Sequence, residues 1–152
     1  MKPTTLFVKI LMLWVAMSSQ AAFAQMSSQA AFTQQSPGEK LIRDYYAAYE
    51  KKDWGMLESI LADGFTFSSP VDEHISLKDY KEKCWPNAYN LKKFDVVKLM
   101  VKGEEGFVTY NGLTKDGRSF RNTEYFTFKD GKITSSECFF GPGVNYPNNK
   151  AK

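Results

Sequence analysis

The clearest periodic pattern in the chain lies at residues 120–128, where apolar and polar side chains alternate. Period-two alternation places one set of side chains on a single face of a strand, namely Phe120, Asn122, Glu124, Phe126 and Phe128. A face with three phenylalanines is expected to point inward, where an ionised carboxylate is costly without a partner, a ligand or a raised pKa. The pattern therefore predicts a pocket that contains Glu124 and Asn122.

Signals for three helices precede most of the strand-like segments. Ser36 is a typical N-cap, Pro37 follows it, and Glu39 completes a capping box at the start of a first helix. Asp53 is expected to cap a second, shorter helix that ends at Gly64. A third helix is expected to begin at Ser76 and to be limited in length by Pro86.

The rest of the chain is strand-like. The expected strands cover 65–69, 94–102, 106–113, 119–129 and 132–140. Short glycine-containing turns separate the last four, which favours successive antiparallel hairpins. Helices followed by a sheet meander predict an α+β fold in which N-terminal helices pack on one face of a curved, mainly antiparallel sheet and leave a cone-like cavity.

Residues 1–24 have the form of a secretory signal peptide, with a basic start, a short apolar core and Ala22-Phe23-Ala24 at the end. The apolar run is too short to span a bilayer, so we expect no stable membrane anchor, and an uncleaved anchor is the weaker alternative. We expect a periplasmic or secreted protein with a flexible leader at 25–35, one domain at 36–141 and a flexible tail at 142–152.

Charge narrows the choice of partners. Loss of Lys2 and Lys9 with the signal peptide leaves 18 of the 20 basic residues against 17 acidic ones. Such a balance removes the electrostatic argument for nucleic-acid binding, and we expect no nucleic-acid partner. The sequence has no glycine-rich phosphate loop and a single histidine, so we expect no cofactor and no metal.

Five short segments stand out by their order and spacing: DYYAAY at 44–49, KDW at 52–54, LADGF at 61–65, SP at 69–70 and FKDGKI at 128–133. Together they resemble the SnoaL-like branch of the nuclear transport factor 2-like superfamily. The resemblance extends over residues 38–141 and implies a cone-shaped α+β barrel with a ligand cavity. It does not imply one reaction, because this fold hosts enzymes, binding proteins and association domains.

Steroid isomerases of that superfamily suggest roles for three positions. By resemblance, their oxyanion tyrosine falls on Tyr45 and their protonated sheet acid on Glu124. Their general-base aspartate falls on Ser69, which has no useful basicity and argues against steroid isomerisation. His74 or Asp72 is the alternative base, so the candidate catalytic residues are Glu124, Tyr45, His74 and Asp72.

The expected ligand contacts are Tyr45, Tyr49, Trp54, Phe67, Ser69, Cys84, Trp85, Asn122, Glu124, Phe126, Cys138 and Phe140. Structural alternatives remain open for several of them. Glu124 could merely hydrogen-bond Tyr45 or an arginine in the core, and His74 could be a solvated loop residue. The two cysteines face the cavity by family position, and a disulfide and two free thiols are equal alternatives.

Three functions follow from these residues. The first is an exported domain that binds a small apolar or amphipathic molecule in a cone-shaped pocket without chemistry. The second is a cofactor-free isomerase, cyclase or dehydratase. The third is a homodimeric association module, in which an outward sheet face with Tyr125, Thr127 and Phe139 contacts a second copy.

Overall fold

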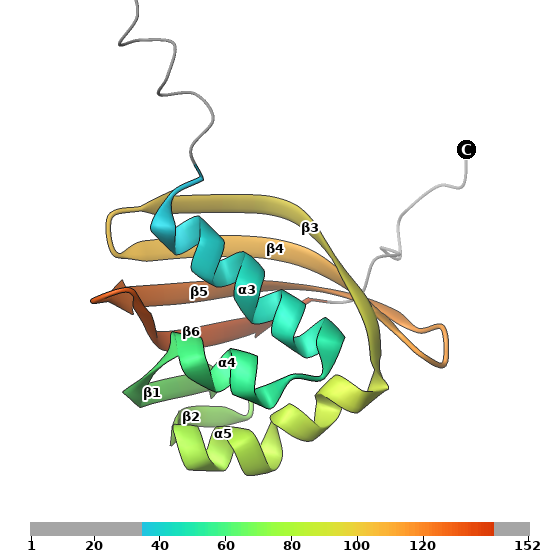
Figure 1. The fold of residues 1–152 in the computed structure, drawn as a ribbon. Helices are drawn as coiled ribbons and strands as arrows, with labels where there is room; N and C mark the ends of the chain where they lie inside the picture. Colours follow the sequence, from blue (N-terminus) through green and yellow to red (C-terminus); the bar gives the residue numbers. More distant parts are fainter. Residues whose placement is uncertain (1–34, 142–152) are drawn as a thin grey trace, which may run out of the picture. The chain divides into compact units, whose positions relative to one another are not determined.

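A computed structural model describes residues 35–141 of the chain (Figure 1). The chain divides into two units, Met1–Gln35 and Ser36–Lys152, and the second contains the fold. The expected signal peptide, leader and C-terminal tail lie outside the described residues, apart from residue 35. Across the described range, no helix is long and apolar enough to cross a membrane.

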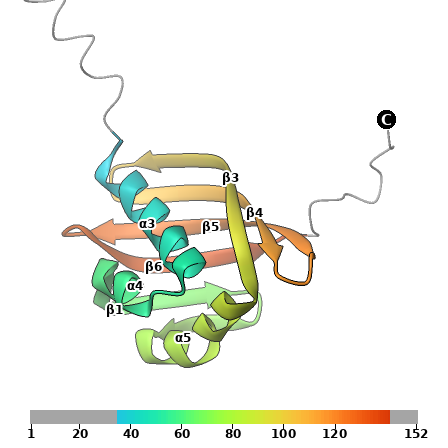
Figure 2. The ribbon, with the colours of Figure 1, turned by 45° about the vertical axis from the view of Figure 1, so that its right-hand side comes forward.

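The first helix, α3 (Pro37–Lys51), begins where the sequence predicts. The Ser36 side chain accepts a hydrogen bond of 3.2 Å from the Glu39 backbone N–H, which satisfies a free donor of the first turn. The helix ends at Lys52, whose backbone is left-handed with φ of 62°. Figure 1 and Figure 2 show α3 crossing one face of the sheet, so its apolar side faces the strands.

Three short helical segments follow: α4 (Trp54–Ile60), α5 (Leu77–Lys83) and the 3₁₀ helix η2 (Trp85–Asn90). Asp53 and Ser76 cap α4 and α5 as predicted. The prediction that Gly64 ends the second helix is wrong, because α4 stops at Ile60 and Gly64 lies within a strand. Leu61 starts that strand because it pairs with Ile133 of the last strand.

The described strands are β1 (Leu61–Ser69), β2 (Asp72–Ser76), β3 (Leu91–Lys102), β4 (Glu105–Thr114), β5 (Ser119–Lys129) and β6 (Lys132–Phe140). They form one sheet in the order β2-β1-β6-β5-β4-β3, in which β1 pairs with β6 in parallel and every other pair is antiparallel. Strand β2 was not predicted, because its short, exposed DEHIS sequence has no apolar alternation.

The predicted fold class is confirmed: helices pack on one face of a curved, mainly antiparallel α+β sheet, which stays open with β2 and β3 at its edges (Figure 1). The alternation at 120–128 is confirmed too. Glu124, Phe126 and Phe128 are buried on the helix side of β5, where Phe126 packs edge to face against Tyr45 and Tyr46 of α3. The carboxylate of Glu124 therefore lies inside the domain.

Candidate functional site

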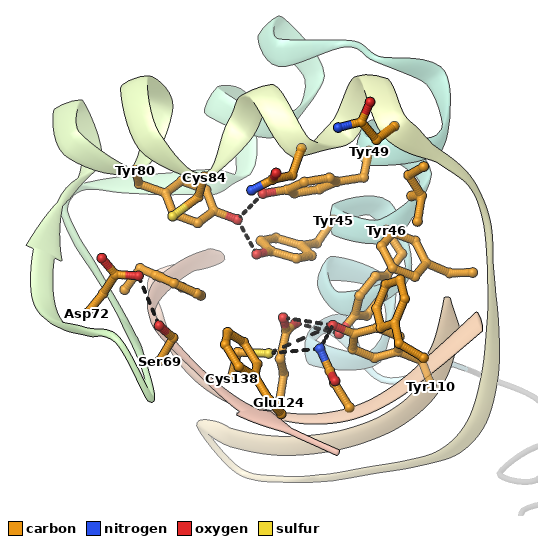
Figure 3. A pocket seen from close by; sticks show the side chains of 18 of the residues that line it. Tyr45, Tyr46, Tyr49, Ser69, Asp72, Tyr80, Cys84, Tyr110, Glu124 and Cys138 are labelled. Atoms are coloured by element: carbon orange, nitrogen blue, oxygen red, sulfur yellow. Dashed lines mark hydrogen bonds between the residues drawn. The ribbon is translucent and has the colours of Figure 1, made fainter. Parts of the chain in front are cut away.

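A cavity of about 540 Å³ opens between the helices and the sheet. Phenol and phenyl rings from α3, α5 and the strands line much of it, and Figure 3 shows two clusters of hydrogen-bonded polar groups together with a separate Ser69–Asp72 pair. Predicted ligand contacts that line it are Tyr45, Tyr49, Phe67, Ser69, Cys84, Asn122, Glu124, Cys138 and Phe140, and Asp72 lines it as well.

Glu124 is the centre of the first cluster. Its side chain is 5% exposed, and the Tyr46 hydroxyl donates a hydrogen bond of 2.5 Å to its Oε2. The Tyr110 hydroxyl lies 3.2 Å from the other carboxylate oxygen. Asn122 Nδ2 donates in turn to Tyr110 Oη at 3.3 Å and to Cys138 Sγ at 3.5 Å. We refer to Tyr46, Tyr110, Asn122, Glu124 and Cys138 as the carboxylate cluster.

Sheet register explains why these side chains meet. Glu124 pairs with Val108 on β4 and with Cys138 on β6. Tyr110 and Asn122 form the next inward-facing pair on β4 and β5. Alternation sends all these side chains to the helix side of the sheet, where Tyr46 of α3 completes the cluster.

Burial controls protonation in this cluster. Loss of hydration raises the pKa of Glu124, and hydrogen bonds from Tyr46, Cys138 and Tyr110 act in the opposite direction. Burial also raises the pKa of the Tyr46 and Tyr110 phenols and of the Cys138 thiol, and the nearby Glu124 carboxylate adds to each shift. The phenols and the thiol therefore stay protonated at neutral pH and serve as donors.

The second cluster consists of three phenols, and we call it the tyrosine triad. The Tyr80 hydroxyl from α5 hydrogen-bonds to the hydroxyls of both Tyr45 and Tyr49 from α3, the latter at 2.5 Å (Figure 3). Three hydroxyls share two hydrogen bonds, so one proton remains available to an acceptor in the cavity. Burial raises the pKa of all three phenols, which keeps that proton in place.

The structure changes one pairing that the sequence suggested. Tyr45, the tyrosine matched to the oxyanion donor, bonds to Tyr80, whereas Tyr46 and Tyr110 bond to Glu124. The alternative in which Glu124 hydrogen-bonds Tyr45 in the core is therefore wrong. Both side chains still line the cavity, and the Glu124 charge acts on the Tyr45 phenol. Tyr45 and Glu124 thus line the same cavity but belong to different hydrogen-bonded clusters.

Asp72 stands on the cavity rim at the start of β2. Its carboxylate accepts a hydrogen bond of 2.9 Å from Ser69 Oγ, and the same oxygen of Ser69 accepts one from the Val71 N–H at 3.2 Å. These bonds fix the carboxylate at the turn between β1 and β2, next to Ser69 (Figure 3). Lys83 and Arg118 are the cations of the rim, and both side chains are largely exposed.

Some predicted site residues lie elsewhere. His74 is exposed on β2, has a backbone φ of 48°, and is absent from the cavity lining. Phe126 is fully buried in the core, and Trp54 and Trp85 pack edge to face against each other with ring centroids 5.4 Å apart. None of these three aromatic residues lines the cavity, and Phe126 packs edge to face against Tyr45 of α3.

Both cysteines line the cavity and both are free thiols. Cys138 is buried in the carboxylate cluster, whereas Cys84 is half-buried at the end of α5. Burial raises the pKa of Cys84 to about 11, with a further contribution from Asp72. A thiol with such a pKa is a poor nucleophile at neutral pH.

Sequence reasoning missed Tyr46, Tyr80 and Tyr110. A signal existed for Tyr46, because Ile42 and Tyr46 are four residues apart on the same helix face as Tyr45. Alternation through Val108 placed Tyr110 on the inner face of β4 as well. Finding Tyr80 required the packing of α5 against β1, which brings the Tyr80 hydroxyl to Tyr45 and Tyr49 of α3 and which no local pattern contains. Over residues 35–141, no group of acidic, histidine or cysteine side chains is arranged to hold a metal ion.

Comparisons with solved structures support the fold. An NTF2-like protein of unknown function from Cytophaga hutchinsonii is 20% identical, with a TM-score of 0.57 over 73% of this chain and 95% of that one. A candidate ketosteroid isomerase from Kribbella flavida is 18% identical, with a TM-score of 0.63 over 77% and 87%. A candidate polyketide cyclase from Sinorhizobium meliloti is 20% identical, with a TM-score of 0.57 over 65% and 93%.

No sequence among the curated proteins matches the chain significantly. A family model for the SnoaL-like domain matches residues 42–136, which include most of α3, the rim at Ser69 and Asp72, and Glu124 on β5. The chain therefore belongs to the SnoaL-like family.

Proposed function

We propose that the mature chain is an exported protein that binds a small apolar or amphipathic molecule in the cavity. The observation that carries this proposal is a cavity of about 540 Å³ with aromatic walls and a buried carboxylate. Small-molecule sites are usually concave and apolar, with a few polar groups that orient the ligand. The signal-like sequence at residues 1–24 supports export.

A direct test uses N-phenyl-1-naphthylamine, a neutral apolar probe that is excited outside tryptophan absorption. Wild-type protein is expected to bind it, and Cys84→Trp, which fills the cavity from its wall, is expected to weaken binding by at least about tenfold. Val97→Trp is the matched control, since Val97 is 45% exposed and outside the lining. Equal binding by wild type and Cys84→Trp contradicts the proposal.

Proton transfer at carbon is a second candidate function, and the position of Asp72 favours it. Asp72 lines the same cavity as Tyr45 and Glu124, beside the Ser69 position where related isomerases carry their base. In this reaction the Asp72 carboxylate removes a proton from the carbon next to a carbonyl. The carbonyl oxygen gains the electron pair and accepts hydrogen bonds from Tyr45 and protonated Glu124, and the proton then returns to carbon.

Deuterium exchange into 2-tetralone tests this second function, because its α-protons are acidic. Wild-type protein is expected to accelerate exchange. The rate of catalysed exchange with Asp72→Asn is expected to be at least about 100-fold lower than with wild type. Glu73→Gln serves as the control, since Glu73 is an exposed neighbour outside the cavity. Exchange at the uncatalysed rate with wild-type protein rules this function out for simple ketones.

A homodimer is a third candidate, favoured by apolar side chains on the outer sheet face. Phe107 is 49% exposed, Phe139 is 46% exposed, and the Phe107 ring lies 4.7 Å from the Tyr125 ring. Neighbouring exposed rings are typical of a surface that contacts a partner. Sedimentation velocity is expected to show a dimer that Phe107→Glu converts to a monomer. A monomeric wild type contradicts this candidate.

A further inference from the structure

Glu124 has no cationic partner within the described fold. Its hydrogen-bond partners are the phenols of Tyr46 and Tyr110, together with the Cys138 thiol, and all of them are neutral at neutral pH. Among residues 35–141, no salt bridge includes Glu124. Buried carboxylates are usually paired with a positive charge, and within the described fold Glu124 lacks such a partner.

The cations at the rim are engaged with carboxylates of their own segments. Lys83 lies 3.0 Å from Asp79 on α5, and Arg118 lies 2.8 Å from Asp116 in the β4–β5 turn. The Lys83 and Arg118 side chains are both more than half exposed, which is typical of solvated surface pairs. Neither cation compensates the charge of Glu124.

The carboxylate retains acceptor capacity toward the cavity. Two oxygens offer about four lone-pair positions. Within the described residues, Tyr46 uses one position on Oε2, Tyr110 uses one on Oε1, and the Cys138 thiol uses a third. The surrounding wall includes several aromatic rings, among them those of Tyr45, Tyr46, Tyr110 and Phe94. Aromatic rings attract a positively charged group through their quadrupole.

We propose that the ligand carries a positively charged nitrogen, an alkylammonium group, which pairs with the Glu124 carboxylate inside this aromatic wall. The inference rests on the proposed ligand-binding function and specifies its ligand class. The ammonium donates to the remaining acceptor position of Glu124, while the apolar remainder of the molecule lies against the rings. The positive charge also offsets the burial that raises the pKa of Glu124.

A neutral ligand with a carbonyl group makes a different demand on the same side chain. It requires Glu124 to be protonated and to donate a hydrogen bond to the carbonyl oxygen. Glutamine retains an N–H donor but has no negative charge. Glu124→Gln therefore separates the two ligand classes, since it preserves donation to a carbonyl and removes attraction for an ammonium.

The test compares phenethylammonium with propylbenzene, which has the same shape with CH₃ in place of NH₃⁺. Calorimetry on mature wild-type protein is expected to show phenethylammonium binding at least about tenfold more tightly. Glu124→Gln is expected to lose that preference and to bind propylbenzene within about twofold of wild type. Glu137→Gln on the exposed side of β6 removes the same charge outside the cavity and is expected to keep the preference.

The outcomes separate the two proposals. Binding of propylbenzene without a preference for phenethylammonium overturns the cation inference and leaves the ligand-binding function standing. A preference that survives in Glu124→Gln also overturns the inference, because the charge recognised then lies elsewhere. Failure of both probes to bind wild type at millimolar concentration overturns the inference together with the cavity function. Propylbenzene binding by Glu124→Gln reports that the variant has kept its folded pocket.

Discussion

The Tyr46 hydroxyl lies 2.5 Å from Glu124 Oε2, and both side chains are at most 5% exposed. A hydrogen bond to a buried carboxylate is shorter and stronger than one between neutral groups. This contact joins the first helix to the centre of the sheet across 78 positions of sequence. The contact therefore links the stability of the fold to the protonation of Glu124 in the cavity.

Stability is expected to depend on pH through Glu124. Its folded pKa is raised above the ordinary value of 4.5, so the folded state holds a proton that the unfolded state has released. The free energy of unfolding should therefore fall as pH rises from 4.5 through the folded pKa, by up to about 1.4 kcal/mol per pH unit within that window. Urea unfolding at a series of pH values measures this slope.

Glu124→Gln is expected to remove the fall in the free energy of unfolding over this pH range, because glutamine does not titrate. Glu137→Gln, on the exposed side of the neighbouring strand, should leave the slope unchanged. A Glu124→Gln profile as steep as that of wild type would assign the pH dependence to another group.

Tyr46→Phe is expected to destabilise the fold by about 1–3 kcal/mol, since the buried carboxylate loses its shortest hydrogen bond. The pKa of Glu124 should rise further, because the Tyr46 hydroxyl acts to lower it. Chemical denaturation gives the stability change, and NMR of the labelled carboxyl carbon gives the pKa. Tyr89→Phe, at a side chain that is 57% exposed, should change neither quantity.

The two outer members of the tyrosine triad depend unequally on the central one. Tyr80→Phe removes both hydrogen bonds of the triad and leaves the buried Tyr45 hydroxyl without a partner in the described fold. We expect a loss of roughly 1–3 kcal/mol, and about half of that for Tyr49→Phe, which preserves the Tyr45–Tyr80 bond. Thermal unfolding of the two variants tests the ranking, and an equal loss would show that Tyr45 gains little from Tyr80.

Gly112→Ala is expected to alter the cavity wall. A Cβ at position 112 would stand 2.1 Å from Phe120 Cζ, so the Phe120 ring, which lines the cavity, must move. We expect destabilisation of about 1–3 kcal/mol from overpacking. Gly64→Ala is the matched control, because a Cβ there meets no atom within 4 Å.

A double-mutant cycle with Phe120→Ala identifies the cause. If the clash is responsible, Gly112→Ala should cost far less when Phe120 has been shortened. Additive losses in the double variant would place the cost in the strand backbone instead.

Much of the fold was predictable, because its signals are local. The capping residues Ser36, Asp53 and Ser76 fix the helix starts, and alternation at 119–129 fixes the inner face of β5. The start of β1 at Leu61 was missed, since only pairing with the distant Ile133 makes those residues extended. Local patterns do not contain that pairing.

The candidate site was predictable only in part. Glu124 and Asn122 follow from alternation, and they line the cavity. The hydrogen-bond partners of Glu124 depend on the rotation of α3 over the sheet, which brings Tyr46 rather than Tyr45 to the carboxylate. Tyr80 required knowledge of how α5 packs. Individual residues were therefore easier to find than their pairings.

The parallel pairing of β1 with β6 affects how the molecule is assembled over time. Strand β1 ends at the Ser69 and Asp72 turn, and its pairing with the rest of the meander runs through β6, the last described strand. A chain that emerges from its N-terminal end cannot complete this edge of the pocket until residues 132–140 are available. The rim that carries Asp72 therefore forms late in folding, at a stage when the hairpins of β3, β4 and β5 can already have formed.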